Sequence, residues 1–263
     1  MDSVDAEAPP ESSLIVVTGA SSGLGLAFFQ HHAQDTHTSV IGVDRAPWTD
    51  AHGHRHARLR VGPAGLFTQL DITATPAELS QWAAREAIST RPVALVLHCA
   101  GVRGLVPAVE DALPHDVGAA ETLQAMDAAT MHTAFDVNVV GTLHILRALL
   151  PGLRLAAARQ LRPKVVVMSS RMGSVSANVG GGGYAYRASK AALNAIVKSF
   201  SVDVPEVCFA CVHPGRVETG LVKTREEGAI SCEESLQDML PLIQRLGDQS
   251  CCFVDRFGKE VPW

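Results

Sequence analysis

The amino-acid sequence predicts a single doubly wound α/β domain, with helices on both faces of a mostly parallel seven-stranded sheet. Short runs rich in β-branched residues alternate with longer amphipathic stretches along the chain. The short runs have hardly a polar interruption, which is typical of strands buried on both faces of a parallel sheet. Composition does not shift after the acidic first residues. We therefore expect one domain at residues 13–263, preceded by a disordered tail at residues 1–12.

Seven runs have the length and composition of such strands: Leu14–Thr18, Ser39–Asp44, Leu66–Leu70, Val93–Cys99, Lys164–Ser169, Val207–His213 and Cys251–Asp255. Five stretches between them predict helices, near Leu24–Gln34, Pro76–Thr90, Ala128–Leu150, Tyr184–Val202 and Cys232–Leu246. The second helix has the clearest start signal, because Thr75 is a suitable N-cap and a proline follows it.

Composition excludes several classes of protein. The chain of 263 residues is 47% hydrophobic and 19% charged, which is enough apolar material for a large core. Its net charge of −5 supplies no basic field to hold nucleic acid. No uninterrupted apolar run approaches the roughly 18 residues of a membrane-spanning helix, and residues 1–12 lack the pattern of a secretory signal. We expect a cytoplasmic protein without nucleic-acid or membrane partners.

Cysteine and histidine patterns give no metal site. Six cysteines are too few for a disulfide scaffold in a chain of this length. Cys208 and Cys211 lie in an apolar run expected to be a strand, where residues three apart point to opposite faces. His52, His54 and His56 form the one metal-like group, but their glycine- and arginine-rich surroundings favour a solvated loop.

A glycine-rich turn follows the first predicted strand and leads into a helix. Its glycines allow a tight turn and let backbone N–H groups approach a pyrophosphate, while two serines add hydroxyl donors. A plain loop is the alternative, but the strand–turn–helix context indicates a Rossmann-like dinucleotide site. The residues expected to contact the cofactor here are Gly19, Ser21, Ser22, Gly23, Leu24 and Gly25.

The end of the second predicted strand bears on the choice of cofactor. Asp44 follows Gly25 by nineteen residues, close to the spacing of an acid that binds the adenosine ribose hydroxyls. Arg45 comes next and could instead receive the 2′-phosphate of NADP(H). Because the Asp44 carboxylate would repel that phosphate, the sequence favours NAD(H), with NADP(H) as the alternative.

Catalytic candidates lie in the second half of the chain. Tyr186 and Lys190 are four residues apart, so a helix places both on one face, where an ammonium lowers the pKa of a phenol. Such a tyrosine is a general acid and base, although a surface pair has the same spacing. Ser170 ends the fifth strand and could donate to a substrate oxygen, with Ser169 on the opposite face. Asn138 lies in a long predicted helix, where it could merely bond a carbonyl four residues back.

Together these motifs resemble the short-chain dehydrogenases/reductases over about residues 13–263. TGASSGLG resembles the family's cofactor turn, and Asn138, Ser170, Tyr186 and Lys190 match its catalytic tetrad. The resemblance implies further cofactor contacts: Asp71 and Ile72 near the adenine, Cys99, Ala100 and Gly101 in HCAG, and Pro214, Gly215, Val217 and Thr219 in HPGRVET. HCAG stands where the family usually has NNAG, so asparagines of the family are replaced at His98 and at Cys99, and the one at Cys99 helps to brace the sheet.

The stretch from Ser169 to Asn194 and the ending FVDRFGKEVPW look like the C-factor-like and sniffer-type carbonyl reductases. The resemblance implies hydride transfer between a nicotinamide cofactor and a carbonyl or secondary alcohol. In that reaction Tyr186 protonates the oxygen, Ser170 hydrogen-bonds it, Lys190 holds the nicotinamide ribose, and Asn138 anchors a water. A catalytically idle cofactor-binding sensor or signalling protein is the alternative.

Two segments are expected near the site, and the resemblance also bears on the oligomeric state. Residues 102–129 contribute to the substrate pocket or form a surface insertion, and Val222–Ser231 are expected to form a lid. Relatives pair through the helices that carry Asn138 and Tyr186, which implies a homodimer or tetramer.

Overall fold

A computed structural model describes residues 13–247 and 251–263, so the predicted tail at residues 1–12 lies outside the described part. It confirms the doubly wound, Rossmann-like α/β fold. The central sheet has the order β10-β9-β8-β7-β1-β2-β6-β5. Its strands are β1 (Leu14–Thr18), β2 (Ser39–Asp44), β5 (Arg58–Val61), β6 (Gly65–Gln69), β7 (Val93–His98), β8 (Lys164–Met168), β9 (Cys208–His213) and β10 (Cys252–Asp255).

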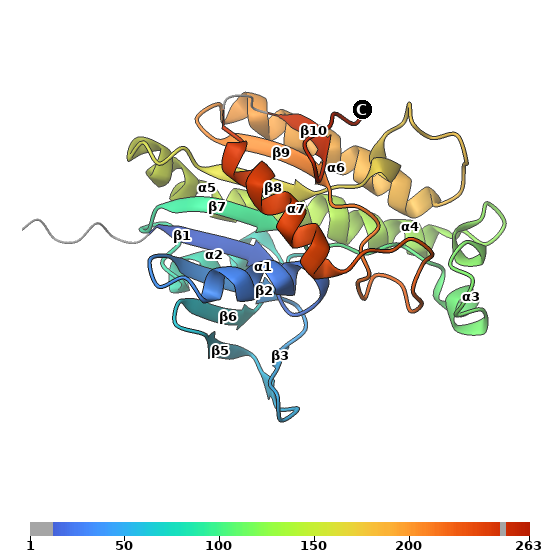
Figure 1. Ribbon diagram of the computed structural model, residues 1–263, viewed down its shortest axis with the longest axis horizontal. Coiled ribbons are helices and arrows are strands. Elements are labelled where there is room, and N and C mark those ends of the chain that lie inside the picture. The colour runs from blue at the N-terminus through green and yellow to red at the C-terminus, as the bar shows by residue number, and fades with distance from the viewer. Residues whose placement is uncertain (1–12, 248–250) are drawn as a thin grey trace, which may run out of the picture.

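Helices cover both faces of this sheet. In Figure 1, α1 and α7 lie in front of the sheet, and α2, α5 and α6 lie behind it. The helices are α1 (Gly23–Ala33), α2 (Pro76–Arg85), α3 (Pro107–Ala112), α4 (Ala128–Phe135), α5 (Thr142–Ala158), α6 (Tyr184–Asp203) and α7 (Cys232–Arg245). A π-helical turn (Asp136–Gly141) joins α4 to α5, and short 3₁₀ turns occupy Ala119–Glu121 and Arg171–Gly173.

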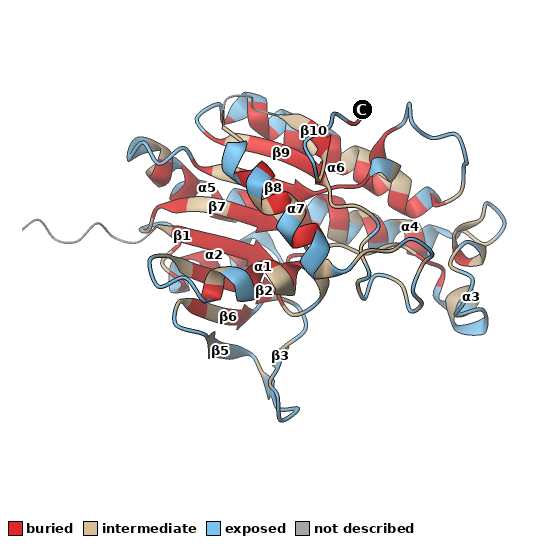
Figure 2. Ribbon diagram, viewed as in Figure 1, coloured by how far each residue is buried: buried red, intermediate tan, exposed pale blue. Residues whose placement is uncertain are grey.

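The hydrophobic core lies on both sides of the sheet, as the continuous apolar strands predict. Figure 2 shows the central strands mostly buried, with a half-buried stretch in β7, while the helices alternate between buried and exposed faces. Trp82 of α2 is buried, and its indole Nε1 donates to the Thr68 hydroxyl of β6 at 3.0 Å. The α2 start signal is confirmed, since Thr75 and Glu78 form a reciprocal capping box.

The prediction of seven strands was wrong by one edge strand. β5 pairs antiparallel with β6, and its residues alternate between exposed arginines and half-buried apolar side chains. This polar alternation is expected of an edge strand with one face in solvent. It lacks the continuous apolar run by which the other strands were predicted.

The histidine-rich stretch forms a short hairpin, in which His52 and His54 lie in the solvent-exposed turn, as predicted, and His56 lies on a strand. β3 (Trp48–Thr49) pairs with β4 (Arg55–His56). The carboxylate of Asp50 organises the turn: it accepts backbone N–H groups from His52 and His54 and bonds the His56 ring at 2.9 Å.

Two predicted helices have different ends in the structure. α2 ends at Arg85 instead of Thr90, because Ala87 adopts a left-handed φ of 57°. The predicted helix Ala128–Leu150 instead becomes α4, the π-helical turn and α5, which continues past the exposed Pro151 to Ala158.

By length and composition, the continuous helical stretch Ala128–Ala158 could cross a membrane, which the sequence prediction excluded. Half of its most apolar window is buried inside the protein, as in a core helix. The stretch is therefore weak support for a membrane span.

Candidate active site

A cleft of about 620 Å³ opens at the carboxyl ends of β1, β2, β7, β8 and β9. This is the edge of an open α/β sheet where ligands are expected to bind. All predicted cofactor residues line it: Gly19, Ser21, Ser22, Gly23, Leu24, Gly25, Asp44, Arg45, Asp71, Ile72, Cys99, Ala100, Gly101, Tyr186, Lys190, Pro214, Gly215, Val217 and Thr219. The cleft thus joins the glycine turn to the tyrosine and lysine.

The glycine turn has the close backbone packing that a dinucleotide requires. Gly19 has a φ of 70°, and a Cβ there would meet the Ala100 backbone nitrogen at 2.9 Å. A Cβ on Gly25 would collide with the Gly19 carbonyl. Helix α1 begins directly after Ser22, so its free N–H groups and positive dipole end face the cleft. These residues fit a pyrophosphate group.

Asp44 is fixed against this turn. Its Oδ2 accepts the Ser21 backbone N–H at 3.1 Å, and its Oδ1 accepts the N–H of Ala46 at 3.1 Å. The neighbouring Arg45 is exposed at the rim of the same cleft, with its backbone carbonyl bonded to the Gln69 side chain. The carboxylate is therefore the charged group closest to the glycine turn on this strand end.

A buried chain of hydrogen bonds crosses the sheet beneath the cleft. The Ala100 N–H donates to the Thr18 hydroxyl at 3.2 Å, and the Thr142 hydroxyl donates to the Asn138 carbonyl at 2.8 Å. His98 joins the two hydroxyls, at 2.8 Å on each side. Because Thr142 already donates, it accepts from His98 Nε2, and His98 Nδ1 accepts from Thr18. The imidazole is thus neutral.

His98 therefore links β1, β7 and α5 next to Cys99, where the asparagine that braces the sheet in the family is absent. Cys99 itself is half-buried, and desolvation of its thiol raises the pKa to about 12 and keeps the thiol protonated. Burial, and then the charge of Lys190, lower the pKa of His98 from 6.5 to about 3.

We expect the protein to lose stability in mild acid because of His98. Below pH 6.5 the unfolded chain binds a proton at this histidine, whereas the folded chain does so only near pH 3. The free energy of unfolding should therefore fall by about 1.4 kcal/mol per pH unit from this group as the pH drops through that window. His32 and His213, with pKa values lowered to about 4 by burial, act in the same direction.

Denaturant unfolding at about pH 7.5 and pH 5 measures this effect, and His98→Asn should have a smaller difference between the two pH values. His52→Asn, on the exposed hairpin, is the matched control and should behave as the parent. An unchanged pH dependence in His98→Asn would contradict the assignment.

Tyr186 and Lys190 lie together on α6, as predicted, and both are buried. The Lys190 Nζ donates to the Met168 carbonyl at 2.8 Å and lies 5.6 Å from the Tyr186 ring centroid. Burial lowers the pKa of Lys190 to about 8. Burial also raises the pKa of Tyr186, opposed by the charge of Arg103 and a hydrogen bond with Ser170. The expectation of a lowered phenol pKa was therefore wrong for this structure.

The two serines at the end of β8 have different partners. The Ser170 side chain lies beside the Tyr186 phenol, where it lowers the pKa of that group, and its hydroxyl accepts the Met172 backbone N–H at 3.1 Å. The Ser169 hydroxyl instead donates to the Asn194 side chain at 2.6 Å. Of the two, the structure brings Ser170 to the tyrosine.

The Asn138 side chain connects two other chain segments beside the cleft. Its Oδ1 accepts the Val102 N–H at 2.8 Å, and its Nδ2 donates to the Val102 carbonyl at 2.9 Å and the Ser189 hydroxyl at 3.0 Å. The alternative of a bond to a carbonyl four residues back is wrong, because the π-helical turn directs this amide towards β7 and α6. With these three bonds made, the side chain positions protein groups beside the cleft, and its predicted anchoring of a water stays a prediction.

Three residues of the site escaped sequence reasoning. Arg103 lies in the cleft with its guanidinium 4.9 Å from the Tyr186 ring centroid, and it is paired with Glu121. Eighteen residues separate this arginine and glutamate, so no periodic pattern links them. Arg256, near the C-terminal end, also lines the cleft.

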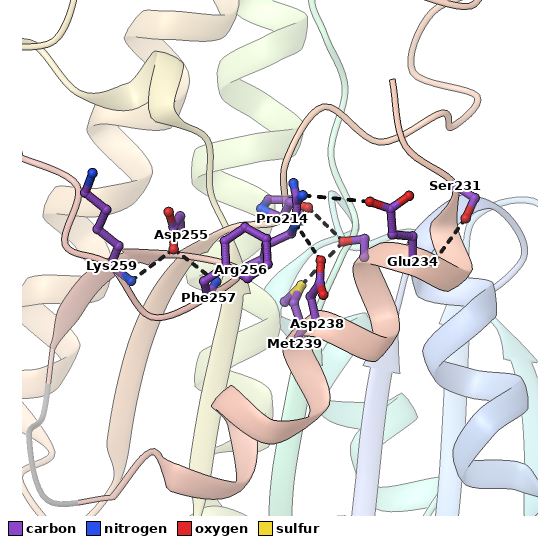
Figure 3. A network of polar contacts seen from close by, with 10 residues as sticks. Pro214, Ser231, Glu234, Asp238, Met239, Asp255, Arg256, Phe257 and Lys259 are labelled. Carbon is purple, nitrogen blue, oxygen red and sulfur yellow. Dashed lines mark hydrogen bonds and ion pairs between the residues drawn. The ribbon is translucent and has the colours of Figure 1, made fainter. Parts of the chain in front are cut away.

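Arg256 attaches α7 to the strand end at β10 (Figure 3). Its Nε donates to Asp238 at 2.6 Å, and its Nη2 lies 3.9 Å from Glu234. The Ser235 hydroxyl of the same helix donates to the Pro214 carbonyl at 2.8 Å. Helix α7 is therefore fixed to the HPGRVET stretch that lines the cleft.

The predicted lid and the segment 102–129 contact each other. Lys223 binds Asp111 at 2.5 Å, and Glu226 lines the cleft. Ile230 bonds back to Arg216 and Glu218 at the base of the predicted lid. Both segments thus contribute residues to the lining of the cleft.

The fold is that of a Rossmann-like α/β protein, the cleft has the features of a dinucleotide site, and comparison with known proteins defines the family. The family model for short chain dehydrogenases matches residues 13–229. C-signal of Myxococcus xanthus is 38% identical over 179 residues, which cover 67% of this chain and 96% of that protein. The 1-hydroxy-2-glutathionyl-2-methyl-3-butene dehydrogenase of Rhodococcus sp. (strain AD45) is 30% identical over 239 residues, covering 89% and 92%.

Solved structures agree with this fold. The NADPH-bound carbonyl reductase from chicken fatty liver has a TM-score of 0.77 at 25% identity, covering 96% of this chain and 100% of that one. The carbonyl reductase Sniffer of D. melanogaster has a TM-score of 0.76 at 23% identity, covering 96% and 99%. The chain therefore belongs to the short-chain dehydrogenase/reductase family of oxidoreductases.

Proposed function

We propose that this protein transfers a hydride between a nicotinamide cofactor and a carbonyl or secondary alcohol, with Tyr186 as the general acid and base. The observation that carries the proposal is that Tyr186 and Lys190 line the same cleft as the glycine turn, with the Ser170 side chain beside the phenol at the end of β8. A phenol and a hydroxyl that converge in this way form a site for one substrate oxygen.

The cofactor, when bound, supplies or accepts the hydride. The protein's residues stabilise and then neutralise the negative charge that develops on the substrate oxygen. Tyr186 donates its proton to this oxygen, and Ser170 hydrogen-bonds it. Lys190, with a pKa of about 8, is close enough to neutrality to exchange protons with the medium, and it would hold the nicotinamide ribose. Asn138 keeps Val102 and Ser189 in place around the tyrosine and lysine.

For the cofactor we propose NAD(H). Support comes from Asp44, whose carboxylate is bonded to the glycine turn, where a 2′-phosphate would be repelled. Ser22, moreover, adds no positive charge to the turn. The chicken carbonyl reductase is described with bound NADPH, so this choice needs a direct comparison of the two cofactors.

A second candidate is a cofactor-binding signalling protein, which the likeness to C-signal favours. The two functions differ in turnover. Purified protein should reduce members of a panel of ketones, aldehydes and quinones with NADH or NADPH if the first proposal holds. Cofactor binding by fluorescence titration without turnover on the panel would favour the signalling role.

A further inference from the structure

Tyr186 lies close to two cations, of which sequence reasoning anticipated only Lys190. The guanidinium carbon of Arg103 is 4.9 Å from the phenol ring centroid, nearer than the Lys190 nitrogen at 5.6 Å. A guanidinium over an aromatic face is attracted to the ring, and the attraction grows when the ring carries negative charge. Arg103 is therefore placed to act on the charge state of the tyrosine.

Arg103 is held in this position by Glu121. Its Nε and Nη2 each donate to one carboxylate oxygen at 2.9 Å, a bidentate pair in which the side chains are 15% and 13% exposed. The Glu121 backbone carbonyl accepts the N–H of Gly183, which precedes the first residue of α6. The pair is thus bound to the helix that carries Tyr186.

Gly104 allows this close approach. It has a φ of 72°, and a Cβ there would lie 2.8 Å from the Cβ of Ala185, the residue before Tyr186. Only a glycine lets the chain after β7 pack so closely against α6. The segment 102–129 thereby delivers both Arg103 and its glutamate partner to the tyrosine.

We propose that Arg103, held by Glu121, is a positioning residue that stabilises the phenolate form of Tyr186. The inference rests on the proposed role of Tyr186 as acid and base. The charged groups around the phenol are Lys190 on its own helix, Arg103 and Glu121 from the segment 102–129, and Glu226 from the predicted lid. Among these charges Arg103 has the largest effect on the pKa of the phenol, and it opposes the effect of burial and of both glutamates.

The test is a titration of Tyr186 itself, which needs no substrate. The chain has two tyrosines, so Tyr184→Phe leaves Tyr186 as the single one. In this background, ¹³Cζ-tyrosine NMR at matched pH values reports the fraction of phenolate, and circular dichroism confirms folding at each pH. Arg103→Met should raise the pKa of Tyr186 by about one unit, because a cation is lost at close range.

Arg103→Lys keeps the charge, so the pKa of Tyr186 should rise by at most half as much as in Arg103→Met. Arg154→Met removes an arginine from a surface pair with Glu206 and should titrate as the parent does. An unchanged pKa in Arg103→Met would overturn the proposal. So would a shift in Arg103→Lys as large as in Arg103→Met, since it would indicate packing rather than charge.

Activity gives a separate readout. If the enzyme turns over, the basic limb of the kcat/KM profile in Arg103→Met should move to higher pH along with the NMR titration. A Tyr186 shift in a protein without turnover on the carbonyl panel would contradict the proposed function while supporting the action of Arg103. Failure of the proposed action of Arg103 and failure of the proposed function therefore give different results.

Discussion

Tyr186→Phe is expected to lose at least about a thousandfold in kcat, within the range that a positioned general acid contributes. Phenylalanine retains the ring that packs beside Arg103 and lacks the hydroxyl that lies beside Ser170. Cofactor affinity should therefore change less than about twofold, since the ring remains in place. Steady-state kinetics on the best substrate of the panel, together with cofactor fluorescence titration, measure both quantities.

Tyr184→Phe is the matched control, because Tyr184 starts the same helix and is 39% exposed. It should retain the activity of the parent. Turnover in Tyr186→Phe similar to that in Tyr184→Phe would contradict the role of Tyr186 and favour another proton donor in the cleft.

Asp44→Ser should shift cofactor preference towards NADPH by about a hundredfold in the ratio of kcat/KM values. Removing the carboxylate eliminates a repulsion of several kcal/mol between two close negative charges, of which solvent at the cleft rim screens a part. Arg45 is then free to meet a 2′-phosphate at the end of β2. Kinetics with NADH and NADPH at one fixed substrate concentration give the ratio.

Asp203→Asn removes an exposed carboxylate at the far end of α6 and should leave the cofactor ratio unchanged. A parent protein that already prefers NADPH would contradict the proposed choice of NAD(H). A parent that prefers NADH, with no change in Asp44→Ser, would show that other residues determine the preference.

The sequence predicted the centre of the sheet well because burial on both faces leaves a continuous apolar signal. β1 and β2 have the predicted ends, and β6 is displaced by a single residue. β5 was missed because an exposed edge permits arginines. The π-helical turn was missed because its sequence is as apolar as the helices on either side of it.

For the site, local patterns and the family resemblance predicted residues that line the cleft, whereas partners outside those motifs were not predicted. The glycine turn and the Tyr186–Lys190 pair are local patterns. The contact of Arg103 with Tyr186, by contrast, depends on how the chain folds back, which spacing alone does not encode. The catalytic roles, the cytoplasmic location and the homo-oligomer remain predictions.

The buried histidine has a consequence for engineering this protein towards the family pattern. Thr18, His98 and Thr142 come from β1, β7 and α5. Each donates a hydrogen bond to the next, so all bonds of the chain run in one direction. Exchanging His98 alone for the family's asparagine would leave a shorter side chain between two buried hydroxyls. Consensus substitutions at these positions should therefore be non-additive, and they have to be introduced as a set.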